Sequence, residues 1–284
     1  MWASPQPAVT AGESAAACAR GVRDPGLRKR VTGARREFLA NSARLQTAAA
    51  SDKLHEAAAG DYLLPGLSPD ELLWLYKAQL SRKNSPGRRA VYNQIMVGAP
   101  FGLCVYCRHS AATTLDHFVP KALVPGLSID PWNLVPACSD CNHGLLDSFS
   151  QQPTEQMLHP YFMPQIGRWL TASVDHTLPA VVQFAATPDA SLAPEIQARI
   201  RNQFDKLDLG RRYSILCGSE LSGLSRLLPA RFSRTDPAEI SAYLSEASHA
   251  AFETDRNDRR AVMYEALAAD DWYCTGGYAP AAAP

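Results

Sequence analysis

Residues 104–142 read CVYCRHSAATTLDHFVPKALVPGLSIDPWNLVPACSDCN and carry the strongest structural signal in this chain of 284 residues. Two Cys-x-x-Cys pairs bracket the stretch, formed by Cys104, Cys107, Cys138 and Cys141. Four thiolates in two closely spaced pairs suit one tetrahedral Zn²⁺, and a site with four protein ligands has a structural role. A single pair would leave redox use or chance as an equal alternative, but two pairs favour metal binding.

Side chains that suit hydrolysis lie between and beside these pairs. A neutral His117 imidazole can accept a proton from water near pH 7. Neighbouring residues of a strand point to opposite faces, so Asp116 is expected to face a metal ion while His117 faces the attacking water. The amide oxygen of Asn142 is the expected second ligand, and so sparse an oxygen shell suits Mg²⁺. Two alternatives stay open, namely His143 as a ligand of this metal and His109 as a zinc ligand.

Two short strands and a helix are predicted around these side chains. Residues 113–119 and 133–137 have the composition of strands, and a proline-rich loop separates them. A helix is expected from about residue 141 to residue 148. The order is therefore strand, loop, strand and helix.

The stretch resembles the HNH endonucleases, in the subgroup of ββα-metal nucleases that carries a zinc site. The resemblance covers about residues 98–150 and includes the spacing of nine positions between Asn133 and Asn142. It implies hydrolysis of DNA phosphodiester bonds with Mg²⁺ or Mn²⁺, giving 3′-OH and 5′-phosphate ends. It also implies that Asn133 anchors the loop and orients the backbone near His117. Leu145 is a departure, because many members carry a lysine there that contacts phosphate.

Composition and charge limit the class of protein. Hydrophobic residues make up 46% of the chain, which suits a globular protein of one or two domains. The formal net charge is zero, so bulk electrostatics do not indicate a nucleic-acid binder. Basic residues nevertheless cluster at positions 20–36 and 77–89, where phosphate contacts and solvated helix faces are equally good interpretations. The start of the chain lacks a signal-peptide pattern and no apolar run is long enough to span a membrane, so a cytoplasmic protein is expected.

The expected fold class is α+β, a mainly helical body with an embedded zinc-stapled ββα-metal unit and a small β-hairpin after it. The hairpin is predicted from two β-rich runs, residues 168–174 and 180–186, and helices are predicted at 196–207, 215–228 and 237–269. The expected regions are a disordered tail (1–22), a helical region (23–97), the nuclease unit (98–150), a hairpin with a helical region (151–275) and a flexible tail (276–284).

The expected function is a metal-dependent endonuclease that acts on DNA, duplex in preference to RNA, with restriction or anti-phage defence as a setting. One alternative is a zinc-stabilised module that binds nucleic acid without cutting it. Another is a nuclease that stays silent until a partner or activator arrives. A protein partner or a homo-oligomer also stays open.

Overall fold

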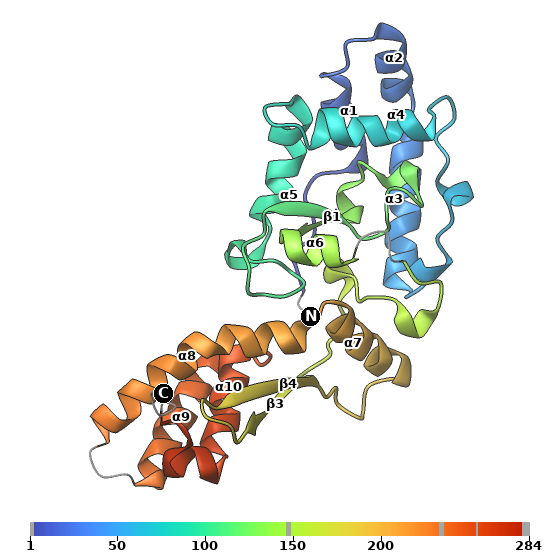
Figure 1. Ribbon diagram of the computed structural model, residues 1–284. Coiled ribbons are helices and arrows are strands. Elements are labelled where there is room, and N and C mark those ends of the chain that lie inside the picture. The colour runs from blue at the N-terminus through green and yellow to red at the C-terminus, as the bar shows by residue number, and fades with distance from the viewer. Residues whose placement is uncertain (1–2, 146–148, 233–235, 254, 280–284) are drawn as a thin grey trace. The chain divides into compact units, whose positions relative to one another are not determined.

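The computed structural model describes residues 3–145, 149–232, 236–253 and 255–279. It confirms the α+β class, with a mostly helical chain and two small antiparallel sheets (Figure 1). Two compact units divide the chain, residues 1–164 and residues 165–284. None of the helices in the described part of the chain is both long and apolar enough to cross a membrane.

The N-terminal unit contains six α-helices in its described residues, together with two π-helical segments and one β-hairpin. The α-helices are α1 (Ala11–Ala19), α2 (Pro25–Gly33), α3 (Arg35–Ala50), α4 (Pro69–Trp74), α5 (Asn93–Val97) and α6 (Ser139–Leu145). The π-helices are Leu75–Leu80 and Arg88–Tyr92, and the strands are β1 (Thr114–His117) and β2 (Leu134–Ala137).

The prediction of a disordered tail over residues 1–22 is wrong, because helix α1 forms there. Thr10 caps the helix reciprocally with Glu13: the Glu13 amide donates to Thr10 Oγ1 (3.2 Å), and the Thr10 amide donates to Glu13 Oε2 (2.8 Å). The small side chains of its alanines let the helix pack closely, and Cys18 is fully buried. Residues 1 and 2 lie outside the described residues.

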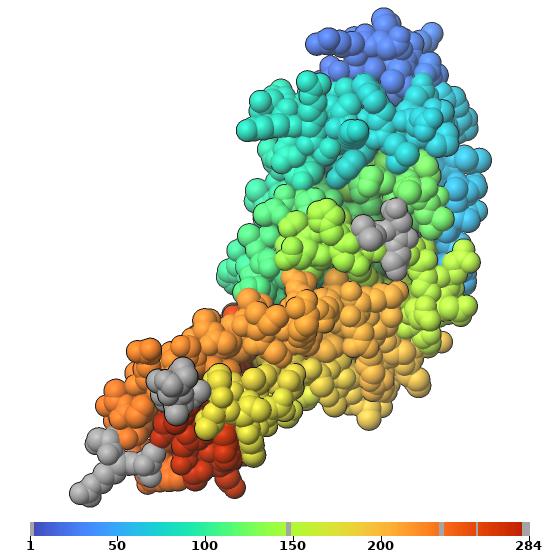
Figure 2. All heavy atoms as spheres, viewed as in Figure 1, coloured from blue at the N-terminus to red at the C-terminus, as the bar shows by residue number. Residues whose placement is uncertain are grey.

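The strand–loop–strand–helix order is confirmed. Strands β1 and β2 pair antiparallel, with Asp116 opposite Val135 and His117 opposite Leu134. Helix α6 begins at Ser139, two residues before the predicted start, and its predicted end at residues 146–148 lies outside the described residues. In the space-filling view α6 lies at the surface, with its residues 139, 140, 143 and 144 exposed (Figure 2).

One hydrophobic core joins the N-terminal helices to this hairpin. Phe38 of α3 and Leu75 of the π-helix belong to the same buried cluster as Leu115 of β1 and Leu134 of β2. The expected boundary between residues 97 and 98 therefore falls inside a shared core, and the helical region and the hairpin form one unit.

The C-terminal unit begins with the predicted hairpin, now seen as β3 (Leu170–Asp175) paired with β4 (Val181–Ala186). Four helices follow, α7 (Pro194–Lys206), α8 (Leu209–Arg231), α9 (Pro237–Phe252) and α10 (Arg259–Ala268). The single helix predicted over residues 237–269 is thus wrong. The chain breaks after α9 because Asp258 caps a new helix, accepting hydrogen bonds from the amides of Arg260 (2.8 Å) and Ala261 (3.1 Å).

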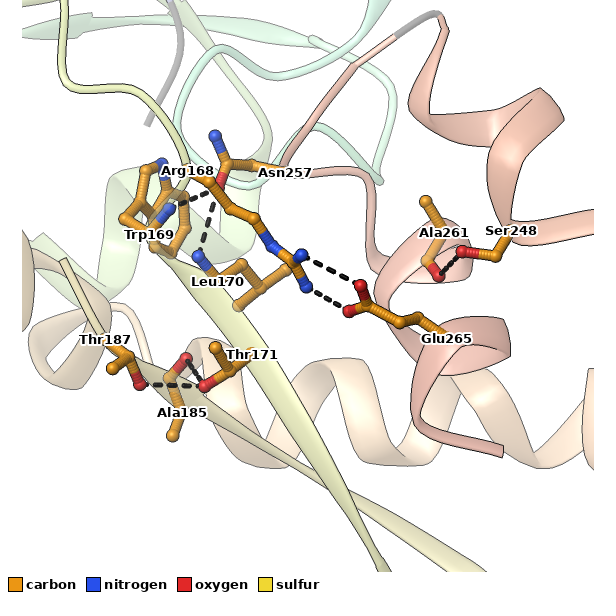
Figure 3. A network of polar contacts seen from close by, with 10 residues as sticks. All are labelled: Arg168, Trp169, Leu170, Thr171, Ala185, Thr187, Ser248, Asn257, Ala261 and Glu265. Atoms are coloured by element: carbon orange, nitrogen blue, oxygen red, sulfur yellow. Dashed lines mark hydrogen bonds and ion pairs between the residues drawn. The ribbon is translucent and has the colours of Figure 1, made fainter. Parts of the chain in front are cut away.

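A polar network ties the α9–α10 connection to the first strand of this unit (Figure 3). Asn257 Oδ1 accepts hydrogen bonds from the amides of Trp169 (2.8 Å) and Leu170 (3.0 Å). Arg168 forms a two-pronged ion pair with Glu265 of α10. These contacts fix the edge of the hairpin against the helices.

The expected flexible tail over residues 276–284 is only partly described. Gly276 and Gly277 end a π-helix that begins at Tyr273, and the Tyr278 ring lies edge-on to Tyr273 with its side chain buried. The start of this segment is therefore packed, and the prediction is wrong there. Residues 280–284 lie outside the described residues.

Candidate functional site

The four paired cysteines come together in the fold. The Sγ atoms of Cys104, Cys107, Cys138 and Cys141 are all buried and lie within 4.8 Å of one another. A tetrahedral zinc ion with Zn–S bonds of about 2.3 Å would separate its sulfurs by about 3.8 Å, and the Cys107–Cys138 sulfur distance is 4.0 Å. The donor set therefore fits zinc without His109.

Local structure explains why these sulfurs meet. The first pair lies in a tight loop in which the Cys104 amide donates to the Ser110 carbonyl (2.9 Å) and Arg108 has a positive φ of 53°. The second pair spans the end of β2 and the first turn of α6, where the Cys141 amide donates to Cys138 Sγ (3.4 Å). A metal held here would join the loop to the hairpin and the helix.

His117 ends β1 and is only 7% exposed. Its Nε2 lies 2.9 Å from the carbonyl oxygen of Ser128. Because a carbonyl oxygen can only accept, Nε2 must carry the ring proton, and Nδ1 keeps its lone pair. Burial lowers the pKa of His117 to about 3, the Lys121 ammonium adds to this, and the Ser128 carbonyl opposes it. The ring is therefore neutral, in the form that a general base needs.

The ring of His117 is covered by Tyr76 from the π-helix Leu75–Leu80. The two ring centroids are 4.3 Å apart in an edge-to-face arrangement, and the Tyr76 hydroxyl donates to the Leu115 carbonyl (3.3 Å). The Lys121 ammonium also lies near this ring, with Nζ 5.8 Å from the Tyr76 ring centroid. Sequence reasoning gave neither residue a role at the site. Packing of the π-helix against the hairpin brings Tyr76 to His117, whereas Lys121 follows His117 by four residues in the loop after β1.

Asp116 lies beside His117 in β1 and is also 7% exposed. The Tyr106 hydroxyl donates to Asp116 Oδ2 (2.8 Å), and Tyr106 stands between the first two cysteines. Burial raises the pKa of Asp116 to about 6, against the hydrogen bond from Tyr106 and the charge of Lys121, both of which lower it. A desolvated carboxylate of this kind fits a cation, because an added positive charge would stabilise its ionised form.

Asn142 lies on the same face of the hairpin as Asp116. Its Nδ2 donates to Thr114 Oγ1 (3.2 Å), and Thr114 and Asp116 are two residues apart in one strand, so they share a face. One carboxylate oxygen and one amide oxygen form a donor set that suits a hard divalent cation. His143, the alternative ligand, is exposed on α6. The metal-binding roles of Asp116 and Asn142 stay predictions.

Asn133 is fully buried and makes the contacts expected of a loop anchor. Its Oδ1 accepts from the Val119 amide (2.7 Å), while its Nδ2 donates to the carbonyls of Val119 (2.9 Å) and Leu127 (3.3 Å). The Phe118 amide donates to the Asn133 carbonyl (2.9 Å). These bonds fix the backbone that directly follows His117.

Some residues of the two basic clusters contact other parts of the fold. Arg28 donates to the Val22 carbonyl, Arg30 pairs with Glu71, and Arg88 lies over the Tyr92 ring, with its guanidinium carbon 4.0 Å from the ring centroid. Four residues of the second cluster are exposed, namely Lys77, Arg82, Lys83 and Arg89. Contacts within the fold therefore account for part of the basic clusters, and phosphate binding by the exposed residues stays a prediction.

The C-terminal unit has a pocket of about 340 Å³ that is lined by residues of this unit. Its lining is largely apolar and contains no acid, histidine or cysteine; the residues with hydroxyl groups are Ser214, Ser222, Ser225, Tyr273 and Tyr278. This composition offers no general base or metal ligand.

Comparison with known proteins agrees with the site geometry. Residues 104–145 match the HNH endonuclease family. This HNH segment contains both cysteine pairs and all four of Asp116, His117, Asn133 and Asn142. The chain is also 32% identical over 153 residues to Protein ea31 of Escherichia phage lambda, covering 52% of this chain and 51% of that protein. It thus spans about half the length of this relative, and no solved structure matches it.

Proposed function

We propose that this protein is a metal-dependent endonuclease that hydrolyses DNA phosphodiester bonds at its HNH segment. The observation that carries this proposal is the environment of His117. Its Nε2 is tied to the Ser128 carbonyl, so Nδ1 is the atom that can accept a proton, and the carboxyl group of Asp116 is in the adjacent residue. A purely structural hairpin has no need of this combination.

Each residue has a distinct task in the proposed reaction. His117 Nδ1 takes a proton from the attacking water, and Asn133 keeps the neighbouring backbone in place. Asp116 and Asn142 hold Mg²⁺ or Mn²⁺, which when bound would stabilise the charge developing on the phosphate. The four cysteines hold Zn²⁺, which stabilises the fold and leaves no open position for chemistry.

The proposed substrate is DNA, duplex in preference to RNA, and the proposed location is the cytoplasm, where a reducing environment keeps the cysteines available for zinc. The relative at 32% identity is a phage protein, which favours a setting that involves phage or other mobile DNA, with restriction or anti-phage defence as one form.

Plasmid cleavage by the purified protein tests this function. Cleavage is expected with Mg²⁺ or Mn²⁺, is lost in EDTA, and falls at least a hundredfold in His117→Ala. His249→Ala is the matched control, because it removes an exposed histidine from α9 and should cut like the wild type. Cleavage by His117→Ala at the wild-type rate would show that the base is wrongly assigned.

A gated nuclease is the second candidate, and the burial of the site favours it. Asp116 and His117 are each only 7% exposed, so access of a duplex would require movement of the covering residues. This candidate predicts DNA binding by the folded, zinc-loaded protein without cleavage until a partner or activator is added. A binding-only module would stay inactive under every condition.

A further inference from the structure

Lys121 lies near the proposed catalytic residues His117 and Asp116. Its side chain is half-buried, and Nζ lies 5.8 Å from the ring centroid of Tyr76, whose ring lies 4.3 Å from that of His117. Among the residues that the structure describes, no carboxylate forms an ion pair with its ammonium group. A lysine that served only the fold would normally leave its charge in water or pair it.

The backbone that carries Lys121 is fixed relative to His117. The side chain of Asn133 forms hydrogen bonds with both the amide and the carbonyl of Val119, which lies two residues before Lys121. The amides of Leu123 and Val124 both donate to the Pro120 carbonyl (3.0 and 2.9 Å), which closes a turn around Lys121. Because this backbone is fixed, the ammonium can bind a ligand at little cost in backbone entropy.

The ammonium of Lys121 lies within electrostatic range of both His117 and Asp116. The contact with Tyr76 does not account for its position, because a cation 5.8 Å from a ring centroid is at the outer limit of a cation–π interaction. An anion beside His117 would complement this charge.

We propose that Lys121 is a further catalytic residue, which binds a non-bridging oxygen of the scissile phosphate beside His117. This inference rests on the proposed function, since it takes the anion to be a phosphodiester of nucleic acid. A lysine ammonium binds phosphate as a compact point charge with three donors, which suits a single contact of this kind. Neutralising one phosphate also gives a measurable signature in the salt dependence of binding.

DNA binding in a cleavage-deficient background tests the contact. The affinity of His117→Ala for a short DNA duplex is measured over a series of salt concentrations and compared with that of His117→Ala/Lys121→Ala. The second alanine is expected to lower the magnitude of the log–log salt slope by about 0.9, the value for one phosphate contact. Adding Lys53→Ala instead removes an exposed lysine from the turn after α3 and should leave the slope unchanged.

Cleavage by the single variants completes the test. Lys121→Ala is expected to lower kcat on saturating DNA about tenfold or more, and Lys121→Arg to restore part of it. An unchanged salt slope overturns the proposal for Lys121, even if the wild type cuts DNA. A lowered slope without cleavage by the wild type would sustain the phosphate contact and refute the nuclease. A loss of stability with an unchanged slope would show that Lys121 only supports the fold.

Discussion

Asp130 shows how burial changes the chemistry of a single residue. Its carboxyl group is 2% exposed, and Oδ1 accepts from the Trp132 amide (2.9 Å) and from Ser42 Oγ (3.1 Å). Oδ2 is buried and, within the described residues, has no hydrogen-bond partner. Burial raises the pKa of Asp130 to about 7, and the two hydrogen bonds only partly oppose this.

A pH-dependent loss of stability follows from Asp130. Between its unfolded pKa near 3.8 and its folded pKa near 7, the folded state binds more protons than the unfolded state. Its contribution to the free energy of unfolding therefore falls as pH rises through this window, by at most about 1.4 kcal/mol per pH unit. Asp130→Asn keeps the Oδ1 acceptor but cannot ionise, so it should lose less stability between pH 5 and pH 8.

Urea unfolding at the two pH values measures this difference. Asp70→Asn serves as the control, because it removes an exposed carboxylate from the first turn of α4. Equal pH dependence in the wild type and Asp130→Asn would contradict the prediction.

Among the elements, the cysteine loop links the four-cysteine cluster to Asp116, the proposed metal-binding carboxyl group. Tyr106 stands between Cys104 and Cys107, and its hydroxyl donates to Asp116 Oδ2 (2.8 Å). The second cysteine pair joins the end of β2 to α6, the helix that carries Asn142. Zinc binding would therefore position elements on both sides of the proposed catalytic metal.

Cys138→Ser should release the zinc and lower both stability and cleavage. The loss of one of four ligands opens the site, and the loop that holds Tyr106 then loses its connection to the hairpin. Zinc content per chain, measured by elemental analysis, and the thermal unfolding midpoint report the two effects. Cys217→Ser changes a buried cysteine of α8 and should leave the zinc content unaltered. One zinc per chain retained in Cys138→Ser would refute the four-cysteine site.

For the whole molecule, the proposed site lies within one of the two compact units. The HNH segment, the residues that cover His117 and the shared core all lie within residues 1–164. The C-terminal unit has its own core and its own polar network around Asn257 (Figure 3). The proposed chemistry therefore needs only the first unit.

A fragment of residues 1–164 should fold, bind one zinc per chain and cut plasmid DNA under the same metal conditions as the full chain. The reason is that every contact described around the proposed site is internal to this unit. Circular dichroism, zinc content and plasmid cleavage measure the three properties, with His117→Ala in the fragment as the control. A folded, zinc-loaded fragment that cannot cut, beside an active full chain, would assign the second unit a part in the chemistry.

The amino-acid sequence alone predicted the elements with strong local signals. The cysteine spacing indicated the four-cysteine cluster, and strand-like composition indicated both hairpins. It did not predict α1, where Thr10 and Glu13 cap a helix in an alanine-rich segment. It also did not predict the break between α9 and α10, where Asp258 caps a new helix. In these cases packing or a local cap outweighed average composition.

The sequence by itself therefore determined the two cysteine pairs as candidate metal ligands and the order strand–loop–strand–helix. It also identified Asp116, His117, Asn133 and Asn142 as candidate site residues. Only the tertiary structure decided that His117 is buried and held by the Ser128 carbonyl, and that Tyr76 and Lys121 lie beside it. The physical reason is the range of the interactions. Ligand spacing, capping and alternation act over a few residues, whereas the surroundings of His117 depend on how distant segments pack around one core.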